Sequence, residues 1–188
     1  INNRNNNWLR HNINDISKPT KEQRKNNAEV PTCPELVDEL LNLSPRTLWI
    51  NITKVCDLSC GKGNIILGIF DKLYNSMKKK YKNDIERATI IIDKCIYYAD
   101  IDKNNIIITT YLLCSYASYI STADINELLK LTNYYIGDSL KLNIKEIWNF
   151  DEFDMSVQNP PYEERNKNGK SKHGKSNLWT KFIENTFN

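Results

Sequence analysis

Four consecutive residues near the end of the chain, Asn159-Pro160-Pro161-Tyr162, combine groups that can bind and activate an amino group. The Asn159 side chain offers one carbonyl acceptor. The Pro160 carbonyl offers a second, because two prolines fix the backbone and remove two N–H donors. Two acceptors directed at one point suit an –NH2 group, and the Tyr162 ring suits stacking on a flat heterocycle. The alternative is a rigid loop that follows a strand.

The segment 57–64, with the sequence DLSCGKGN, is typical of a turn that lies close to a ligand. Gly61 and Gly63 permit a tight turn and a close approach of the backbone. If a helix follows, its first N–H groups can receive an anion such as a carboxylate. An ordinary strand-to-helix turn has the same composition. The segment is neither a G-x-G-x-x-G motif nor a P-loop, because no Gly-Lys-Ser/Thr closes it.

Two further segments have carboxylates where we expect strands to end. Asp100 and Asp102 follow the run Cys95 to Ala99, well downstream of the glycine turn. An acid in that position is the usual ligand of ribose hydroxyls in an α/β site. Asp138 and Ser139 follow a third apolar run. Each segment taken alone is also typical of a solvated strand end or a simple turn.

The elements that must position these residues alternate between strands and helices, which predicts an α/β fold with a mostly parallel sheet. Ligands of such sheets bind at the carboxyl ends of the strands, where all four segments are expected to lie. We expect strands within Thr47–Asp57 and at Cys95–Ile101, Asn133–Ile136 and Phe153–Val157. We expect helices at Pro34–Leu41, Ile65–Lys80, Ile85–Lys94, Lys103–Ser118, Thr122–Leu131 and Leu178–Phe187.

Composition limits the classes of protein that fit. A chain of 188 residues with 40% hydrophobic residues corresponds to one domain with a real core. The five cysteines include no C-x-x-C pair, so we expect no metal site, and a reducing cytoplasmic setting fits. We expect no membrane span. Residues 1–28 are polar and predict an N-terminal arm, which leaves 29–188 as the folded domain. The net charge of +3 does not by itself identify a partner.

Taken in order, these segments resemble the γ-type amino-methyltransferases, the adenine-N6 DNA methyltransferases of restriction–modification and of phage or large-virus systems. Residues 57–64 resemble the first cofactor motif of that family, and 29–37 resemble its upstream motif, with Cys33 where the family has Pro. The resemblance implies a Rossmann-like fold and an S-adenosylmethionine site formed by Thr32, Asp57, Ser59, Cys60, Gly61, Gly63, Asn64, Asp100, Ile101, Asp138, Ser139 and Asn159. It implies that Asp100 binds the cofactor ribose, that Ile101 lies against the cofactor adenine and that Asp138 lies near the amine of that adenine. It also implies that Asn159, Pro160, Pro161 and Tyr162 are catalytic.

The resemblance also implies a DNA partner, with the target adenine flipped out of the duplex onto Tyr162. A basic segment beyond the tetrapeptide could contact phosphates, or could be a solvated loop; its basic residues are Arg165, Lys167, Lys170, Lys172 and Lys175. Members of the family have further strands and a target-recognition region. We therefore expect that more chain, or a subunit, completes the sheet and reads the target sequence.

Two alternatives remain open at this stage. A release-factor-type protein glutamine methyltransferase uses the same tetrapeptide on a carboxamide –NH2, and an rRNA adenine methyltransferase is a variant of the same idea. The segment 29–37 and the Cys-Gly-Lys-Gly turn argue against the glutamine type. The second alternative is an inactive fragment of a larger complex that binds cofactor or DNA without turnover.

Overall fold

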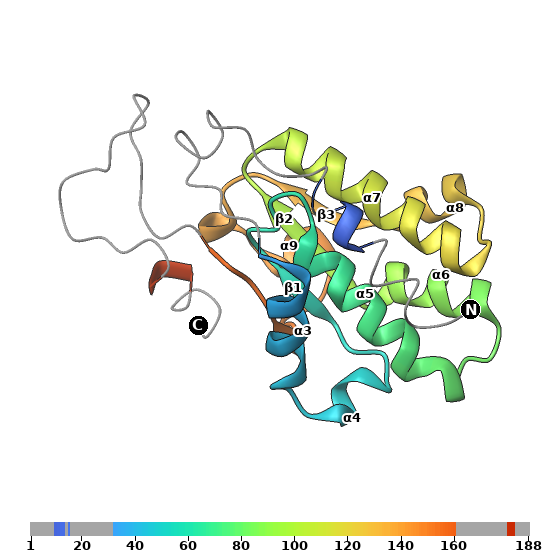
Figure 1. The fold of residues 1–188 in the computed structure, drawn as a ribbon. Helices are drawn as coiled ribbons and strands as arrows, with labels where there is room; N and C mark the ends of the chain where they lie inside the picture. Colours follow the sequence, from blue (N-terminus) through green and yellow to red (C-terminus); the bar gives the residue numbers. More distant parts are fainter. Residues whose placement is uncertain (1–9, 14, 16–31, 161–179, 183–188) are drawn as a thin grey trace.

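A computed structural model describes residues 10–13, 15, 32–160 and 180–182 (Figure 1). Its centre is a four-stranded, all-parallel sheet with the strand order β3-β2-β1-β4. The strands are β1 (Val55–Asp57), β2 (Ile96–Asp100), β3 (Asn133–Ile136) and β4 (Met155–Ser156). The expected parallel α/β sheet is confirmed. The chain moves outward from β1 to β3 and then returns to the other side of β1, so the strand order reverses between β1 and β4.

Helices connect the strands, and those that were predicted begin within a few residues of their expected starts. They are α3 (Pro34–Asn42), α4 (Arg46–Trp49), α5 (Asn64–Ser76), α6 (Asp84–Lys94), α7 (Lys103–Ser121), α8 (Ile125–Lys130) and α9 (Ile144–Trp148), with the 3-10 turns η1 (Met77–Lys79) and η2 (Ser139–Lys141). Residues 180–182 are helical, within the predicted helix Leu178–Phe187. Among the described residues, no helix is both long and apolar enough to cross a membrane.

Two parts of the secondary structure differ from the prediction. The strand expected from Thr47 onward begins only at Val55, and Arg46–Trp49 is a helix instead. This short helix buries the Trp49 ring, whose Nε1 donates to the Ser44 hydroxyl at 2.9 Å. The β-branched residues of this stretch indicated a strand, and burial of one tryptophan outweighed that local preference. Helix α9 was not predicted, because it has only five residues and contributes no fully buried side chain.

The sheet separates two hydrophobic clusters, as the alternation along β2 requires. Ile96 and Tyr98 belong to the larger cluster, which includes the buried faces of α3, α5, α6 and α7. Tyr97 and Ala99 face the opposite side, where the cluster is largely aromatic. There the Tyr97 ring makes edge or tilted contacts with Trp148, Phe150 and Phe153, with ring centroids 5.1–5.5 Å apart. One face is therefore covered by long helices, and the other by α9 and the chain around it.

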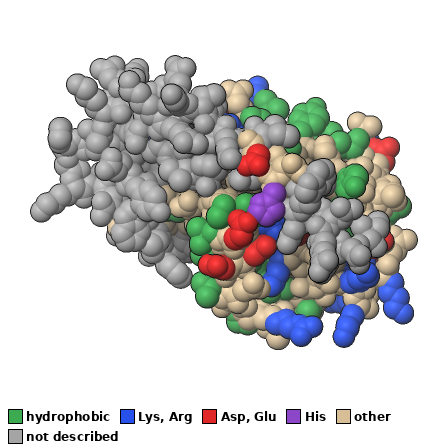
Figure 2. Space-filling model, in the orientation of Figure 1, with side chains coloured by type: hydrophobic (Ala, Val, Ile, Leu, Met, Phe, Trp, Pro, Cys, Tyr) green, Lys and Arg blue, Asp and Glu red, His purple; other side chains and the backbone are tan. Residues whose placement is uncertain are grey.

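A buried arginine ties the first described residues to the core. Arg10 Nη1 lies 2.8 Å from Asp38 Oδ1 and 3.6 Å from Asp71 Oδ2, and the side chain is only 4% exposed. Tyr116 donates to Asp71 at 2.7 Å, so the network joins α3, α5 and α7. On the nearby surface, His11 lies 3.2 Å from Glu35. Figure 2 shows several acidic side chains, in red, close together near the centre of one face of the molecule. Arg10, which the sequence placed in the N-terminal arm, is part of the packed structure.

Helix α3 packs tightly on α5 because one residue of α5 has no side chain. A Cβ atom on Gly68 would overlap Cγ1 of Val37 and lie 3.1 Å from Arg10 Nη2. Val37 is fully buried there. The glycine therefore allows the close approach of α3, the helix that follows Thr32.

We expect Gly68→Ala to lower the free energy of unfolding, because the added methyl group would occupy the space of Val37. Overpacking of this kind costs about 1–3 kcal/mol, and replacing a helical glycine by alanine returns at most about 1 kcal/mol. Urea unfolding followed by circular dichroism measures the change. The control is the Val37→Ala/Gly68→Ala double variant, which makes room for the methyl group and should lose less than the two single losses combined. Fully additive losses would contradict the close packing.

Candidate active site

The glycine turn after β1 lies across the end of the neighbouring strand β2. The Cys60 N–H donates to the Ala99 carbonyl at 3.0 Å, and the Gly61 N–H donates to Asp100 Oδ2 at 2.9 Å. Gly61 and Gly63 have φ values of 52° and 86°, which are left-handed and favour glycine. The turn ends at Gly63, the N-cap of α5. The predicted loop between a strand and a helix is confirmed at this position.

Sequence reasoning missed Thr109, which supports the glycine turn from α7. Its hydroxyl donates to the Gly61 carbonyl at 3.0 Å. A Cβ atom on Gly63 would lie 2.8 Å from Thr109 Cγ2, so the two residues fit only because Gly63 lacks a side chain. No pattern around Thr109 marks it, since one threonine in an apolar helix is ordinary. Only the packing of α7 against the turn reveals its role.

Asp100 holds the turn and the start of α7 together. Its Oδ1 accepts from the Asp102 N–H at 2.8 Å and from Asn105 Nδ2 at 3.4 Å, while Oδ2 accepts from Gly61. Burial raises the pKa of this carboxyl group above its usual value. Its neighbour Ile101 is 76% exposed at the strand end. The assignment of Asp100 to ribose and of Ile101 to the cofactor adenine stays a prediction.

Asp57 is a completely buried carboxylate at the end of β1. Its Oδ1 accepts from the Ser59 N–H at 3.1 Å, whereas Oδ2 has no hydrogen-bond partner among the described residues. Burial, and then the charge of Asp100, raise the pKa of Asp57 to about 7. A buried carboxylate oxygen without a partner costs free energy, and a cation placed beside it would remove that cost.

The segment after β3 also lies at the carboxyl edge of the sheet, where it contacts the residue that follows Asp57. Ser139 is buried and donates to the Leu58 carbonyl at 2.6 Å, which ties it to the residue that follows Asp57. Asp138 caps η2 by accepting from the Leu140 N–H at 3.1 Å, and its second oxygen lies 3.5 Å from Lys141 Nζ. Asp138 thus has a local structural role, and its predicted contact with the cofactor amine is not tested by these contacts.

Thr32 joins the two asparagines of the predicted site. Asn64 Nδ2, at the start of α5, donates to the Thr32 carbonyl at 3.0 Å. Asn159 Nδ2, beyond β4, donates to the Thr32 hydroxyl at 3.1 Å. Thr32 is 7% exposed. The structure therefore brings together residues 32, 64 and 159, which belong to three separate predicted motifs.

The predicted residues Thr32, Asn64, Asp57, Asp100, Ser139 and Asn159 all lie at the carboxyl edge of the sheet, at strand ends or in the turns beside them. Asn159 and the glycine turn flank the point between β1 and β4 where the strand order reverses. Such switch points are where open α/β sheets bind ligands. Pro160 is half-buried and follows Asn159. Pro161, Tyr162, Arg165, Lys167, Lys170, Lys172 and Lys175 lie outside the described residues.

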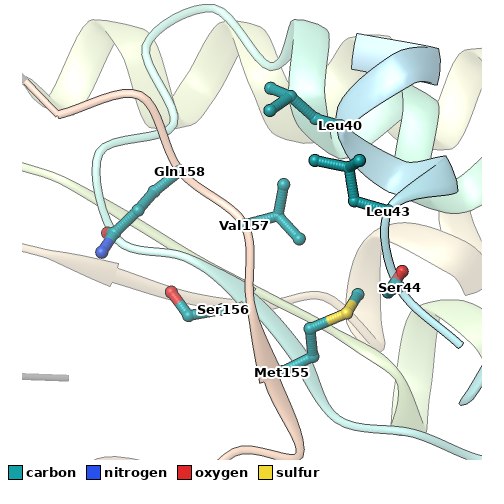
Figure 3. A pocket seen from close by; sticks show the side chains of 7 residues that line it. All are labelled: Leu40, Leu43, Ser44, Met155, Ser156, Val157 and Gln158. Atoms are coloured by element: carbon teal, nitrogen blue, oxygen red, sulfur yellow. The ribbon is translucent and has the colours of Figure 1, made fainter. Parts of the chain in front are cut away.

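A groove of about 350 Å³ lies beside this edge, between α3 and the outer side of β4 (Figure 3). Aliphatic side chains of Leu40, Leu43, Met155 and Val157 line it, together with Ser44, Ser156 and Gln158. Leu43 is 83% exposed. The groove contains none of the predicted cofactor residues, so it is a feature separate from the strand-end site.

No family model and no curated protein matches this chain. Among solved structures, it is similar to a modification subunit described for a type I restriction enzyme of Vibrio vulnificus, with a TM-score of 0.51 and 16% identity over 84% of this chain and 30% of the other. It is also similar to a protein described as an RNA methyltransferase of Pyrococcus horikoshii, with a TM-score of 0.48 and 17% identity over 85% and 57%. The chain thus spans less than two thirds of either structure. The likeness to the first of these structures shows the fold, which is a Rossmann-like α/β fold with a parallel sheet.

The free energy of unfolding should contain a pH-dependent part that comes from Asp57. Its folded pKa of about 7 lies above its usual value of 3.8. The folded state therefore holds the proton more tightly, so the contribution is fully present below about pH 4 and is lost as the pH rises to about 7. The difference between the two values corresponds to about 4 kcal/mol.

Asp57→Asn keeps the shape and removes this titration. The variant should be more stable than wild type at pH 8 and similar to it at pH 4, as urea unfolding at both values would measure. Asp151→Asn, at an exposed carboxylate, is the matched control and should not change the pH dependence. If Asp57→Asn and wild type differ equally at both pH values, Asp57 is not the buried titrating group described above.

Proposed function

We propose that this chain is the cofactor-binding and catalytic part of an S-adenosylmethionine-dependent methyltransferase that methylates the N6 amine of adenine in DNA. One observation carries the proposal: Asn159 lies beside the glycine turn at the switch point of the sheet, and its amide nitrogen is held by Thr32 at 3.1 Å. An asparagine held in this way can direct its carbonyl oxygen toward an amino group brought to the same edge. The order of motifs Thr32, 57–64, Asp100, Asp138 and 159–162 supports the family assignment.

Three features of the described residues fit the cofactor. The buried Asp57 oxygen without a partner suits a positively charged group, such as the α-ammonium of the methionine part. Helix α5 has 13 residues and no side-chain cap at its start, so its first N–H groups can receive the carboxylate. Ile101 is exposed beside Asp100 and would pack on the adenine ring, while Asp100 would bind the ribose. Ser59, Cys60, Gly61, Gly63, Asn64, Asp138 and Ser139 complete the proposed site, and Thr32 contacts it through Asn64.

The protein mainly positions the reactants and polarises the target amine, because S-adenosylmethionine supplies a methyl group already activated by its sulfonium. The amine of adenine is a weak nucleophile, since its lone pair is delocalised into the ring. Hydrogen bonds from the amine to Asn159 Oδ1 and to the Pro160 carbonyl would localise that pair on nitrogen. The pair then forms the new N–C bond, the electrons of the S–C bond return to sulfur, and the amine loses one proton to water. Tyr162 would stack on the flipped base.

We assign the partner as DNA, contacted by the basic residues 165–175, which include no acid. We also propose that further polypeptide completes the sheet. Strand β4 pairs only with β1 among the described residues, so its other edge is open beside the groove of Leu40, Leu43, Met155 and Val157. An added strand would satisfy the outward backbone groups of β4 and cover these aliphatic side chains. That additional part would read the target sequence.

Asn159→Ala should abolish methyl transfer and leave cofactor binding intact. The hydrogen bond from the amine strengthens as the nitrogen becomes tetrahedral, so its loss lowers kcat more than it weakens binding. The expected loss is on the order of 10²–10³ in kcat. The measurement is tritium transfer from S-adenosylmethionine to adenine-containing DNA, with the longer chain or partner present. Asn51→Ala, at an exposed asparagine, is the control.

Parallel assays with RNA and with a release factor distinguish the related activities. Transfer to RNA or protein, and not to DNA, would identify one of the alternative methyltransferases. Near wild-type turnover by Asn159→Ala on DNA would overturn the assignment of the catalytic loop. Cofactor binding without transfer to any substrate would favour a binding subunit.

Removing the charge of the basic segment should weaken DNA binding and reduce the dependence of binding on salt concentration. The variant replaces four lysines by glutamine: Lys167, Lys170, Lys172 and Lys175. Each lost phosphate contact lowers the slope of log K against log salt by about one. The matched control replaces four exposed lysines, Lys78, Lys79, Lys80 and Lys82, which follow the far end of α5. The control removes the same charge and should leave the slope nearly unchanged. Equal slopes for both variants would indicate a general effect of charge.

A further inference from the structure

Thr32 occupies a position from which it contacts both the cofactor side and the catalytic side of the proposed site. Its hydroxyl lies 3.1 Å from Asn159 Nδ2, and its carbonyl lies 3.0 Å from Asn64 Nδ2. The two asparagines are 32 and 127 residues away along the chain, at the start of α5 and beyond β4. Thr32 is 7% exposed, so water competes little for these two bonds. Its own position is fixed by α3, which begins two residues later and packs on α5 at Gly68.

The contact matters because an asparagine carboxamide has two ends of the same shape and opposite hydrogen-bonding character, and the Thr32 hydroxyl accepts from its –NH2 end. The oxygen accepts, whereas the –NH2 only donates. If the –NH2 end faced a target amine, two donors would face each other. The contact with Thr32 uses the Nδ2 end, so the Oδ1 end is directed away from Thr32 and remains able to accept.

We propose that Thr32 is a positioning residue, which orients the Asn159 carboxamide through its hydroxyl and links the catalytic loop to the start of α5. The inference rests on the proposed function. It assigns to Thr32 a role in the transfer step, distinct from the cofactor contact that the motif resemblance implies. Because the hydroxyl acts on Asn159 and not on a reactant, its removal changes kcat and leaves the affinity for S-adenosylmethionine unchanged.

Thr32→Val tests this role, because valine keeps the shape of threonine and lacks the hydroxyl. We expect kcat to fall about 10- to 100-fold, the usual result of misplacing a catalytic group. The KM for DNA and the Kd for S-adenosylmethionine, measured by calorimetry, should stay within about twofold of wild type. Thr32→Ser restores the hydroxyl and should recover most of the turnover. Thr110→Val is the matched control, because it removes a buried hydroxyl that contacts Tyr98 at 2.7 Å, away from Asn159.

A double-mutant cycle provides a readout that needs no activity. Thr32→Val, Asn159→Ala and the double variant are compared by urea unfolding of the cofactor-free protein. The 3.1 Å hydrogen bond couples the two residues, so the double variant should lose less free energy of unfolding than the two single variants lose together. Additive losses would overturn the contact and with it the proposal, whether or not the protein proves to be a methyltransferase.

The activity outcomes separate the two proposals. Wild-type turnover by Thr32→Val would overturn the positioning role and leave the proposed function standing. A tenfold weaker Kd for S-adenosylmethionine at unchanged kcat would also overturn it, since Thr32 would then be a cofactor ligand. If wild type methylates no substrate, the proposed function fails, and the positioning role in methyl transfer fails with it, even where the cycle detects the contact.

Discussion

The rest of the site depends on the contact between the glycine turn and the end of β2. Two backbone N–H groups of the turn, from Cys60 and Gly61, are satisfied by the carbonyl of Ala99 and the carboxylate of Asp100. This fixes where α5 begins, and therefore where Asn64 lies. Asn64 in turn holds Thr32, and Thr32 holds Asn159. A chain of polar contacts thus runs from the end of β2 to Asn159, three residues beyond β4, at the carboxyl edge of the sheet.

The same edge contains a pair of buried carboxylates in an unfavourable electrostatic environment. Asp57 and Asp100 are neighbouring buried carboxylates on adjacent strands, and the pKa of each is raised mainly by burial. Asp100 is compensated by three hydrogen bonds, whereas Asp57 keeps one oxygen without a partner among the described residues. Such unfavourable groups are concentrated at functional sites, where a bound ligand can offset their cost. The cost in stability and the proposed binding of a cation at Asp57 are therefore two consequences of one arrangement.

Most of the architecture was predictable because strong local signals agreed with the final packing. The apolar periodicity of α5 and α7 and the runs that became β2 and β3 were assigned close to their observed bounds, and the parallel sheet followed from their alternation. The exceptions were segments whose state depends on distant contacts. Arg46–Trp49 became a helix to bury Trp49, and α9 is stabilised by packing beside the aromatic cluster around Tyr97. Arg10 looked like part of a polar arm because its partners, Asp38 and Asp71, are far away in sequence.

For the site, the sequence by itself determined which residue types follow each strand: the glycine turn, Asp100, Asp138 and the Asn-Pro-Pro-Tyr run. Because carboxyl ends of parallel strands meet at one edge, it also determined that these segments converge. Only the tertiary structure decided which contacts each of these residues makes. It gave Asp100 and Ser139 structural contacts and left one oxygen of Asp57 without a partner among the described residues. It also brought Thr109 against the glycine turn and placed Thr32 between Asn64 and Asn159. Hydrogen bonds between residues 127 apart depend on ångström-scale packing of α3 on α5, and no local pattern of residues encodes such distances.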